Sequence, residues 1–524
     1  MKLRTIVKIA ITSSVVLLCS GFALYSFFRL SAAEGQKDFN LYELVPSTTS
    51  AVFVTDDVLE FVAEVDELTC SKNQQYLYVS KLFSYLKQSL YALSEDTPHG
   101  LSRQMNQMLI SFHEPDNERN QVLYCRLGNG DKELVNRFVR KYISSLYPPK
   151  TFIYKGEEII IYPMADGDFL ACYLTSDFMA LSFQKKLIEN VIDAYKSGKS
   201  LADDSTFTGI RAPKKSAAAA TIYTRMQGMM GWTEFDMKMK DDFIYFSGIT
   251  HDADTCFAFI NQLRQQQSVK GFPGEVLPST AFYFSRQGIT DWVSLLSYGN
   301  AQGQSVPART SEVQNRDKEF SRYLMENAGQ DLVACLFQRE DTLQDAAAVL
   351  SLSVADVTEA ERMLRALVNA ASADEGRRNP RITFCYTVNK AYPIYRLPQT
   401  TLFEQLTSFA EPTLDVYAAF YGGRLLLAPD ADALAHYIRQ LDKGEVLNGA
   451  MAYQTGMDHL SDSYHFMLMV DFDHIFQQSE NHVRFVPDFF LRNADFFRHF
   501  TLFVQFACAD GMVYPTIVLK YKSE

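Results

Sequence analysis

The sequence lacks the short motifs that mark the common enzyme classes. Its 524 residues contain no G-x-S-x-G nucleophile turn, no phosphate-binding P-loop, no G-x-G-x-x-G dinucleotide turn and no H-E-x-x-H zinc helix. Because a catalytic triad is defined by geometry and not by sequence order, a triad assembled across the fold is not excluded. No cofactor is predicted, since no motif that binds one is present.

An excess of positive charge is also lacking. The chain has 50 Lys and Arg against 62 Asp and Glu, which gives a net charge of −12. A protein that binds nucleic-acid phosphates needs a positive surface, so this balance argues against a nucleic-acid partner. The basic run Arg377, Arg378 and Arg381 lies in the Gly- and Pro-containing stretch EGRRNPR and is typical of a solvated loop.

Low-complexity tracts and C-x-x-C spacings are absent as well. With 47% hydrophobic and 21% charged residues, the composition is that of a globular protein. A chain of 524 residues exceeds the roughly 250–300 at which one hydrophobic core stops growing, so at least two domains are expected. Several of the eight cysteines lie inside apolar runs, which favours free buried thiols; one disulfide in an oxidising compartment is the alternative.

One long hydrophobic run is present, Ile9–Phe28, with 20 residues and no charge. As a helix it would be about 30 Å long, which is the thickness of the apolar core of a bilayer. Lys2, Arg4 and Lys8 precede it, so the positive-inside bias leaves the N-terminus in the cytoplasm and exports the rest of the chain.

We therefore expect a cytoplasmic tip and single transmembrane anchor at 1–30, followed by a linker at 31–40. The short Lys/Arg head is typical of a bacterial inner-membrane protein with a periplasmic body. Small residues near Ala33 offer a cleavage site, and release into the periplasm is the alternative.

The rest of the sequence repeats itself. The phrase VPSTTSAVFV at 45–54 returns as LPSTAFYF at 277–284, and the stretches 181–207 and 427–453 align without a gap at an offset of 246. Further matches follow in the same order, which indicates a tandem duplication of about 230 residues.

Each copy alternates short apolar strands with amphipathic helices and contains direct hairpins, which exclude a purely parallel sheet. The predicted fold is therefore α+β, with a mixed or mostly antiparallel sheet in each copy. The first repeat covers 41–265, a polar Gly/Pro-bearing linker covers 266–276, and the second repeat covers 277–524.

The strand that opens each copy, entered through Val-Pro or Leu-Pro, resembles exported bacterial envelope proteins of unknown function. In those proteins a duplicated domain begins on a Leu-Pro-x-x strand behind a membrane anchor. The resemblance covers the heads of the two copies, Val45–Val54 and Leu277–Phe284, and implies export but no activity or site residues.

The second copy carries about 20 extra residues in a phenylalanine-rich insertion near 481–503. Aromatic anchors dominate protein interfaces, so the insertion is a candidate docking element for an envelope partner. The alternative is a helix whose phenylalanines close the core. The candidate docking residues are Phe485, Phe489, Phe490, Phe496, Phe497 and Phe500.

The stretch MVDFDHIF contains the most metal-like cluster, Asp471, Asp473 and His474. Oxygen and imidazole ligands suit Mn, Zn or Fe, and the two aspartates would share one face of a strand. The competing interpretation is helix capping, which also explains Asp56 and Asp57 at an earlier strand-to-helix junction.

These observations favour a non-catalytic binding or scaffold protein, tethered to the membrane and exposed outside the cytoplasm. Its partner would bind in the groove between the two domains or on the phenylalanine-rich insertion, since pockets form preferentially at domain interfaces. The alternative is an envelope hydrolase, with or without a metal ion, whose site lies in the second repeat.

Overall fold

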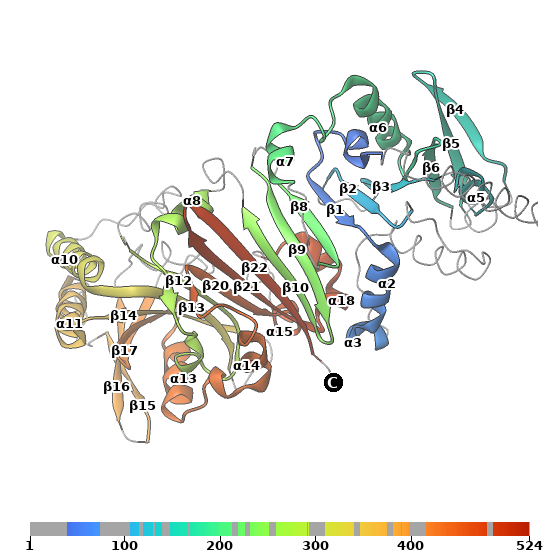
Figure 1. Ribbon diagram of the computed structural model, residues 1–524. Coiled ribbons are helices and arrows are strands. Elements are labelled where there is room, and N and C mark those ends of the chain that lie inside the picture. Colours follow the sequence, from blue (N-terminus) through green and yellow to red (C-terminus); the bar gives the residue numbers. More distant parts are fainter. Residues whose placement is uncertain are drawn as a thin grey trace, which may run out of the picture.

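The computed structural model of the protein is shown in Figure 1. It describes residues 39–73, 105–114, 119–128, 131–138, 147–164, 167–211, 218–225, 231–250, 258–290, 292, 310–339, 346–374, 381–388, 390–397, 416–478 and 486–522. The predicted anchor at 1–30 and most of the linker at 31–40 lie outside the described residues. Among the helices that are described, none is both long enough and apolar enough to cross a bilayer.

The α+β fold class is confirmed: 20 of the described strands form one large antiparallel sheet, and β11 pairs with β19 in a separate two-stranded one. We call residues 41–265 the first half and 277–524 the second half. The strands of the first half are β1 (Ala51–Thr55), β2 (Met108–Phe112), β3 (Gln121–Arg126), β4 (Lys150–Tyr154), β5 (Glu157–Pro163), β6 (Phe169–Leu174), β7 (Phe178–Ser182), β8 (Ala220–Thr224), β9 (Thr233–Lys240) and β10 (Phe243–Thr250). Its helices are η1 (Leu41–Leu44), α2 (Val58–Glu67), α3 (Thr69–Lys72), α5 (Asp131–Phe138), α6 (Lys185–Ser197), α7 (Ser205–Ile210) and α8 (Ala258–Gln265).

Two short elements, β11 (Val269–Lys270) and η4 (Pro273–Glu275), lead into the second half. The strands of the second half are β12 (Ala281–Gly288), β13 (Ala328–Gln338), β14 (Ala346–Val354), β15 (Ile382–Tyr386), β16 (Ala391–Leu397), β17 (Val416–Tyr421), β18 (Arg424–Ala428), β19 (Ser463–Tyr464), β20 (Phe466–Asp471), β21 (Phe500–Ala509) and β22 (Met512–Tyr521). Its helices are α10 (Ser311–Asn327), α11 (Val357–Asp374), α13 (Ala431–Asp442), η6 (Leu447–Gly449), α14 (Met451–Met457), α15 (Phe472–Phe476), α17 (Asp488–Arg492) and α18 (Ala494–Phe497).

The two halves pair their strands in the same order. The first half runs β4-β5-β6-β7-β3-β2-β1-β8-β9-β10 across the sheet. The second half runs β15-β16-β17-β18-β14-β13-β12-β20-β21-β22. Strand β10 then pairs antiparallel with β22, so the two sheets continue into each other through equivalent edges, at the centre of Figure 1.

The repeated Val-Pro and Leu-Pro phrases have the same structural role in both halves. Each leads into the first strand of its half, and its Pro forms an isolated β-bridge, Pro46 with Ser200 and Pro278 with Val446. The segment after the long helix is tied to this entry by the same two backbone hydrogen bonds in each half. The residue before the Pro accepts one of them through its carbonyl, and the residue after the Pro donates the other through its N–H. Segments that match in sequence therefore make the same contacts within their own halves.

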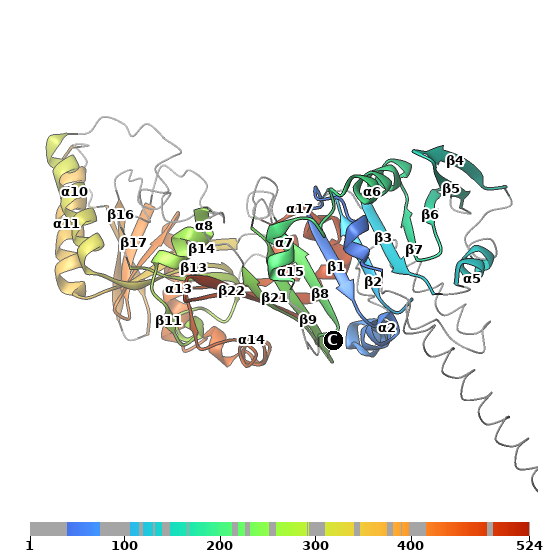
Figure 2. The same cartoon turned by 45° about the horizontal axis from the view of Figure 1, so that its top comes forward.

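Helices cover both faces of the sheet (Figure 2). One face is covered by α2, α3 and α5 in the first half, by α10 and α11 in the second, and by α15 and α18 near the centre. The opposite face is covered by η1, α6 and α7 in the first half and by α13 and α14 in the second. Each half is thus a three-layer arrangement with apolar side chains on both sides of its strands.

The capping interpretation is confirmed at Asp57, and the two long helices end in the same way. Asp57 caps α2 by accepting hydrogen bonds from the backbone N–H groups of Leu59 and Glu60. Asp56 does not cap the helix, and its Oδ1 accepts from Gln107 Nε2 instead. Gly198 and Gly444 follow the long helices with φ of +62° and +77°, the left-handed conformation that ends a helix.

Candidate functional site

Asp471 lies at the junction between β20 and α15 and caps that helix. Its Oδ1 accepts hydrogen bonds from the backbone N–H groups of Asp473 at 3.0 Å and His474 at 3.4 Å. The same oxygen lies 2.8 Å from Lys522 Nζ and 3.3 Å from His474 Nδ1. Asp471 is therefore already held by two backbone donors and two side chains.

The charges around Asp471 act on its pKa and on that of His474. Burial alone would raise the pKa of Asp471, but His474 and Lys522 outweigh burial and hold it below its usual value. The nearby carboxylate of Asp471 raises the pKa of His474 against the opposing effect of burial. The carboxylate and imidazole thus stabilise each other's charged forms.

This geometry does not support the metal site predicted at Asp471, Asp473 and His474. Asp471 and His474 do lie together, but the ammonium group of Lys522 pairs with the Asp471 carboxylate and would compete with a metal ion for its negative charge. Within the residues that the structure describes, no group of three His, Cys, Asp or Glu side chains is arranged to hold a metal ion. Capping accounts for the position of Asp471.

The phenylalanine-rich insertion packs mostly into the core. Phe497 and Phe500 are buried, and the Phe497 ring lies 5.6 Å from that of Phe472 and 4.8 Å from that of Phe490. Phe490 and Phe496 are partly buried against the same cluster. Of the five candidate phenylalanines that the structure describes, only Phe489 is exposed, with 39% of its surface accessible.

The insertion therefore closes the core, because its rings join the apolar cluster that spans both halves. That cluster includes Ile244 from β10 and Leu519 from β22. The docking prediction does not hold for the buried Phe497 and Phe500, since a buried ring has no surface to offer a partner. Phe485 lies outside the described residues.

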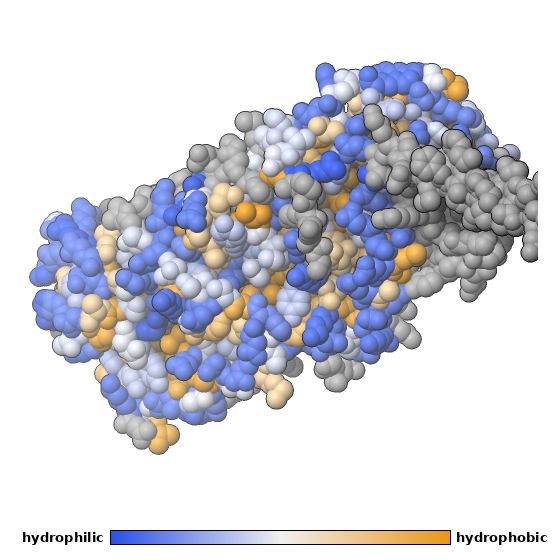
Figure 3. Space-filling model, viewed as in Figure 1, coloured by the Kyte–Doolittle hydropathy of each residue, from blue (hydrophilic) through white to orange (hydrophobic). Residues whose placement is uncertain are grey.

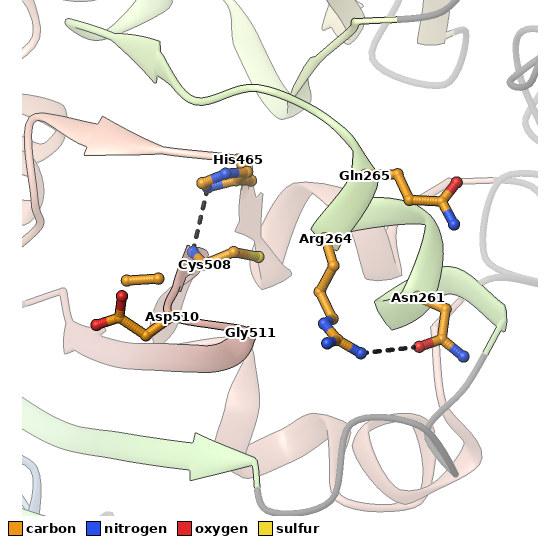
Figure 4. A pocket seen from close by; sticks show the side chains of 8 residues that line it. Asn261, Arg264, Gln265, His465, Cys508, Asp510 and Gly511 are labelled. Atoms are coloured by element: carbon orange, nitrogen blue, oxygen red, sulfur yellow. Dashed lines mark hydrogen bonds between the residues drawn. The ribbon is translucent and has the colours of Figure 1, made fainter.

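A polar pocket of about 600 Å³ lies between α8 and the turn that joins β21 to β22. Helix α8 supplies Asn261, Arg264 and Gln265 from the first half, as Figure 4 shows. The second half supplies the rest of the lining, which is His465, Cys508, Ala509, Asp510 and Gly511. Among the pockets found in the described part of the chain, this one combines residues of both halves.

Local structure places the pocket residues. Asp510 and Gly511 form the β21–β22 turn with φ of +51° and +76°, and a Cβ on Gly511 would approach Arg264 Nη2 to 3.4 Å. Arg264 in turn donates to Asn261 Oδ1 one helical turn away, at 3.5 Å. The positive φ favours glycine at 511, whereas the contact with the guanidinium is an ordinary van der Waals distance that a Cβ could make.

His465 is held in the pocket wall as a neutral acceptor. Its Nδ1 accepts the backbone N–H of Cys508 at 3.2 Å, so the neutral ring carries its proton on Nε2. Burial lowers the pKa of His465, which keeps the ring neutral at physiological pH.

Cys508 is not an activated nucleophile. Burial raises the pKa of its thiol to about 11, although the nearby Arg264 opposes that shift. His465 contacts the backbone of Cys508 and not its sulfur, so the Cys–His arrangement of a thiol hydrolase is not formed. The pocket is equipped to form hydrogen bonds, with guanidinium, carboxamide and imidazole groups, and not for covalent chemistry.

A second polar cluster lies inside the second half. Asp331 Oδ2 accepts from Arg286 Nε at 3.0 Å, and Oδ1 lies 3.2 Å from Arg424 Nη1. The side chains of both arginines are less than 16% exposed. Strands β7 and β18 are equivalent in the two halves, and Phe178 begins β7 where Arg424 begins β18. The first half therefore has no arginine at this position, and the cluster is specific to the second half.

The sequence did not indicate either polar cluster. The pocket combines positions 261–265, 465 and 508–511, which come together only because β10 pairs with β22. The sequence predicted direct hairpins in each copy, but it gave no sign that β10 of one half pairs with β22 of the other. No protein-family model, curated protein or solved structure matches the chain.

Proposed function

We propose that the protein is a non-catalytic binding or scaffold protein of the bacterial cell envelope, and that its partner binds in the pocket between α8 and the β21–β22 turn. The observation that carries this proposal is that one polar pocket is lined by both halves. Pockets at such junctions are common binding sites. The protonated Cys508 thiol and the neutral, backbone-bound His465 argue against a hydrolytic role for the pocket.

The partner is a polypeptide segment. Asn261 and Gln265 present carboxamides, which offer a donor and an acceptor side by side as a peptide group does. Arg264 and Asp510 add one charge of each sign, which suits a polar segment better than a strongly anionic ligand.

The tether and the duplication belong to the same proposal. The charge-free run Ile9–Phe28 anchors the body to the inner membrane with the N-terminus in the cytoplasm. Matching strand order in the two halves supports an origin by tandem duplication. In this account the second copy diverged to carry the phenylalanine-rich insertion and the turn that completes the pocket.

In-cell crosslinking followed by affinity purification tests the proposal on the full-length protein. Ala509→Trp would fill the pocket from an exposed position at the end of β21. Lys240→Trp is the matched control, since Lys240 ends β9 before the equivalent turn and is also exposed. We expect one abundant partner with the wild type and Lys240→Trp, and its loss with Ala509→Trp. Recovery of the protein without any partner, or equal recovery from all three, would refute the proposal.

An envelope hydrolase is the second candidate, and the contact between Asp471 and His474 at 3.3 Å is the observation in its favour. It ranks lower because Lys522 already pairs with the carboxylate. Hydrolysis of an envelope substrate by the purified protein, abolished by His474→Ala, would favour this candidate instead.

A further inference from the structure

Strand β15 forms one outer edge of the sheet and presents apolar side chains to solvent. Among the described strands it pairs on one side only, with β16. Phe384 is 54% exposed and Tyr386 is 72% exposed, and Val388 beyond the strand is 93% exposed. These residues alternate along the chain, so they share one face of the edge. Figure 3 shows hydrophobic atoms at this lower end of the molecule.

The backbone of the same residues points outward. Arg396 N–H donates to the Arg381 carbonyl at 2.8 Å and Thr387 N–H donates to the Lys390 carbonyl at 2.9 Å. In an antiparallel pair the hydrogen-bonded residues alternate with residues whose N–H and C=O groups face away. The outward-facing groups of β15 therefore belong to Ile382, Phe384 and Tyr386.

Between Arg381 and Lys390 the edge carries no charged residue that would discourage pairing. From Ile382 to Val388 the sequence is ITFCYTV. Soluble proteins commonly protect an edge strand with lysine, and the opposite outer edge, β4, follows that rule. Lys150 begins β4, Lys155 follows it, and Lys185 Nζ lies 5.2 Å from the Phe152 ring.

The molecule already contains the kind of contact that this edge would make. Strands β10 and β22 are equivalent edges of the two halves, and they pair antiparallel. An antiparallel pair of equivalent strands is the arrangement that a twofold axis produces between two identical copies.

We propose that β15 pairs antiparallel with β15 of a second copy of this chain, about a twofold axis at Phe384. In this register Phe384 lies opposite its own counterpart and Ile382 lies opposite Tyr386. Aromatic and aliphatic side chains would then meet across the strands, and no like charges would face each other. The proposal is independent of the pocket, which lies at the β10–β22 junction.

Sedimentation equilibrium of the full-length protein in detergent tests this dimer. Tyr386→Lys places a charge on the edge at an exposed position, so folding should not change. Ile153→Lys is the matched control, because Ile153 is 71% exposed on the opposite edge strand. We expect the wild type and Ile153→Lys to dimerise, and Tyr386→Lys to dissociate at least about tenfold more readily, because a strand pair of this length is a small interface.

Oxidative crosslinking of Phe384→Cys in membranes tests the register. A disulfide-linked dimer is expected, since residues that face each other across an antiparallel pair bring their Cα atoms within disulfide range. A wild type that stays monomeric, or a Tyr386→Lys variant that dimerises like the wild type, overturns the proposal. A third outcome would also overturn the proposal: the wild type forms species larger than dimers, and Ile153→Lys loses association as well. The β15 edge of one copy would then pair with the β4 edge of the next.

Discussion

Ile244 of β10 lies directly opposite Leu519 of β22, although 275 residues separate them in the sequence. Both side chains are buried, with 1% and 7% of their surfaces exposed. They belong to one apolar cluster that includes residues of both halves and the rings of the phenylalanine-rich insertion. The two halves therefore share a core at this point, and we expect them to unfold together.

Gly248→Val should destabilise the junction. A Cβ at Gly248 in β10 would lie 2.7 Å from the Phe235 ring and 2.8 Å from Pro515. Overpacking of this kind costs about 1–3 kcal/mol. Gly209→Ala is the control, because a Cβ there meets nothing within 4 Å. Urea unfolding should show the loss only for Gly248→Val, and equal stability of the two variants would contradict the close packing of the junction.

The insertion should behave as core. Phe497→Ala removes a ring that is 95% buried and should cost about 3–5 kcal/mol of folding stability. Phe489→Ala removes a partly exposed ring and should cost about 1 kcal/mol or less. Chemical unfolding measures both. If Phe497→Ala were stable but lost a binding partner, the docking interpretation of the insertion would be restored.

Asp471 should act as a cap and Asp473 should not. Asp471→Ala removes two backbone hydrogen bonds and the contact with Lys522, so a loss of about 2 kcal/mol is expected. Asp473→Ala should change stability by less than about 0.5 kcal/mol. Elemental analysis of the purified protein is the second readout. A stoichiometric metal ion that both variants lose would show that these residues are ligands.

Acid should weaken the first half through His113. Burial lowers the pKa of this imidazole to about 4, and its Nε2 lies 2.9 Å from Ser111 Oγ. The unfolded chain, with a histidine pKa near 6.5, binds the proton more readily, so stability falls as pH drops from about 6.5 towards 4.

His113→Gln should remove that part of the pH dependence. Between pH 7 and pH 5 the wild type should lose about 2 kcal/mol more than the variant, as the two pKa values require. Urea midpoints at both pH values give the comparison. The pH dependence that His474 contributes has the opposite sign. Because Asp471 raises the pKa of His474, its contribution to folding stability is present at low pH and is lost as pH rises. Equal losses in wild type and variant would show that His113 does not titrate as described.

Much of the fold could be predicted because the repeat, the hairpins and the helix ends each depend on short stretches of sequence. The hairpins β9–β10 and β21–β22 follow from alternating apolar residues around a polar turn. The cap at Asp57 and the positive φ of Gly198 follow from the residue types alone.

The pairing of β10 with β22 could not be predicted, because edge strands carry no sequence signal for their partner. The pocket depends on that pairing and was missed with it. Burial of Phe497 was uncertain for a related reason, since a phenylalanine stripe has the same sequence pattern whether it faces a core or a partner. Arg286, Asp331 and Arg424 look like surface charges until three strands bring them together.

A site-specific photo-crosslinker at Gln265 tests the central claim most directly, because this exposed residue of α8 lines the pocket. The same group at Lys238, exposed on β9, is the control. We predict that irradiation of cells links Gln265 to one polypeptide, that Lys238 gives no such product, and that Ala509→Trp abolishes the product at Gln265. No adduct at Gln265, or an adduct that persists when Ala509→Trp fills the pocket, would contradict binding at the junction of the two halves.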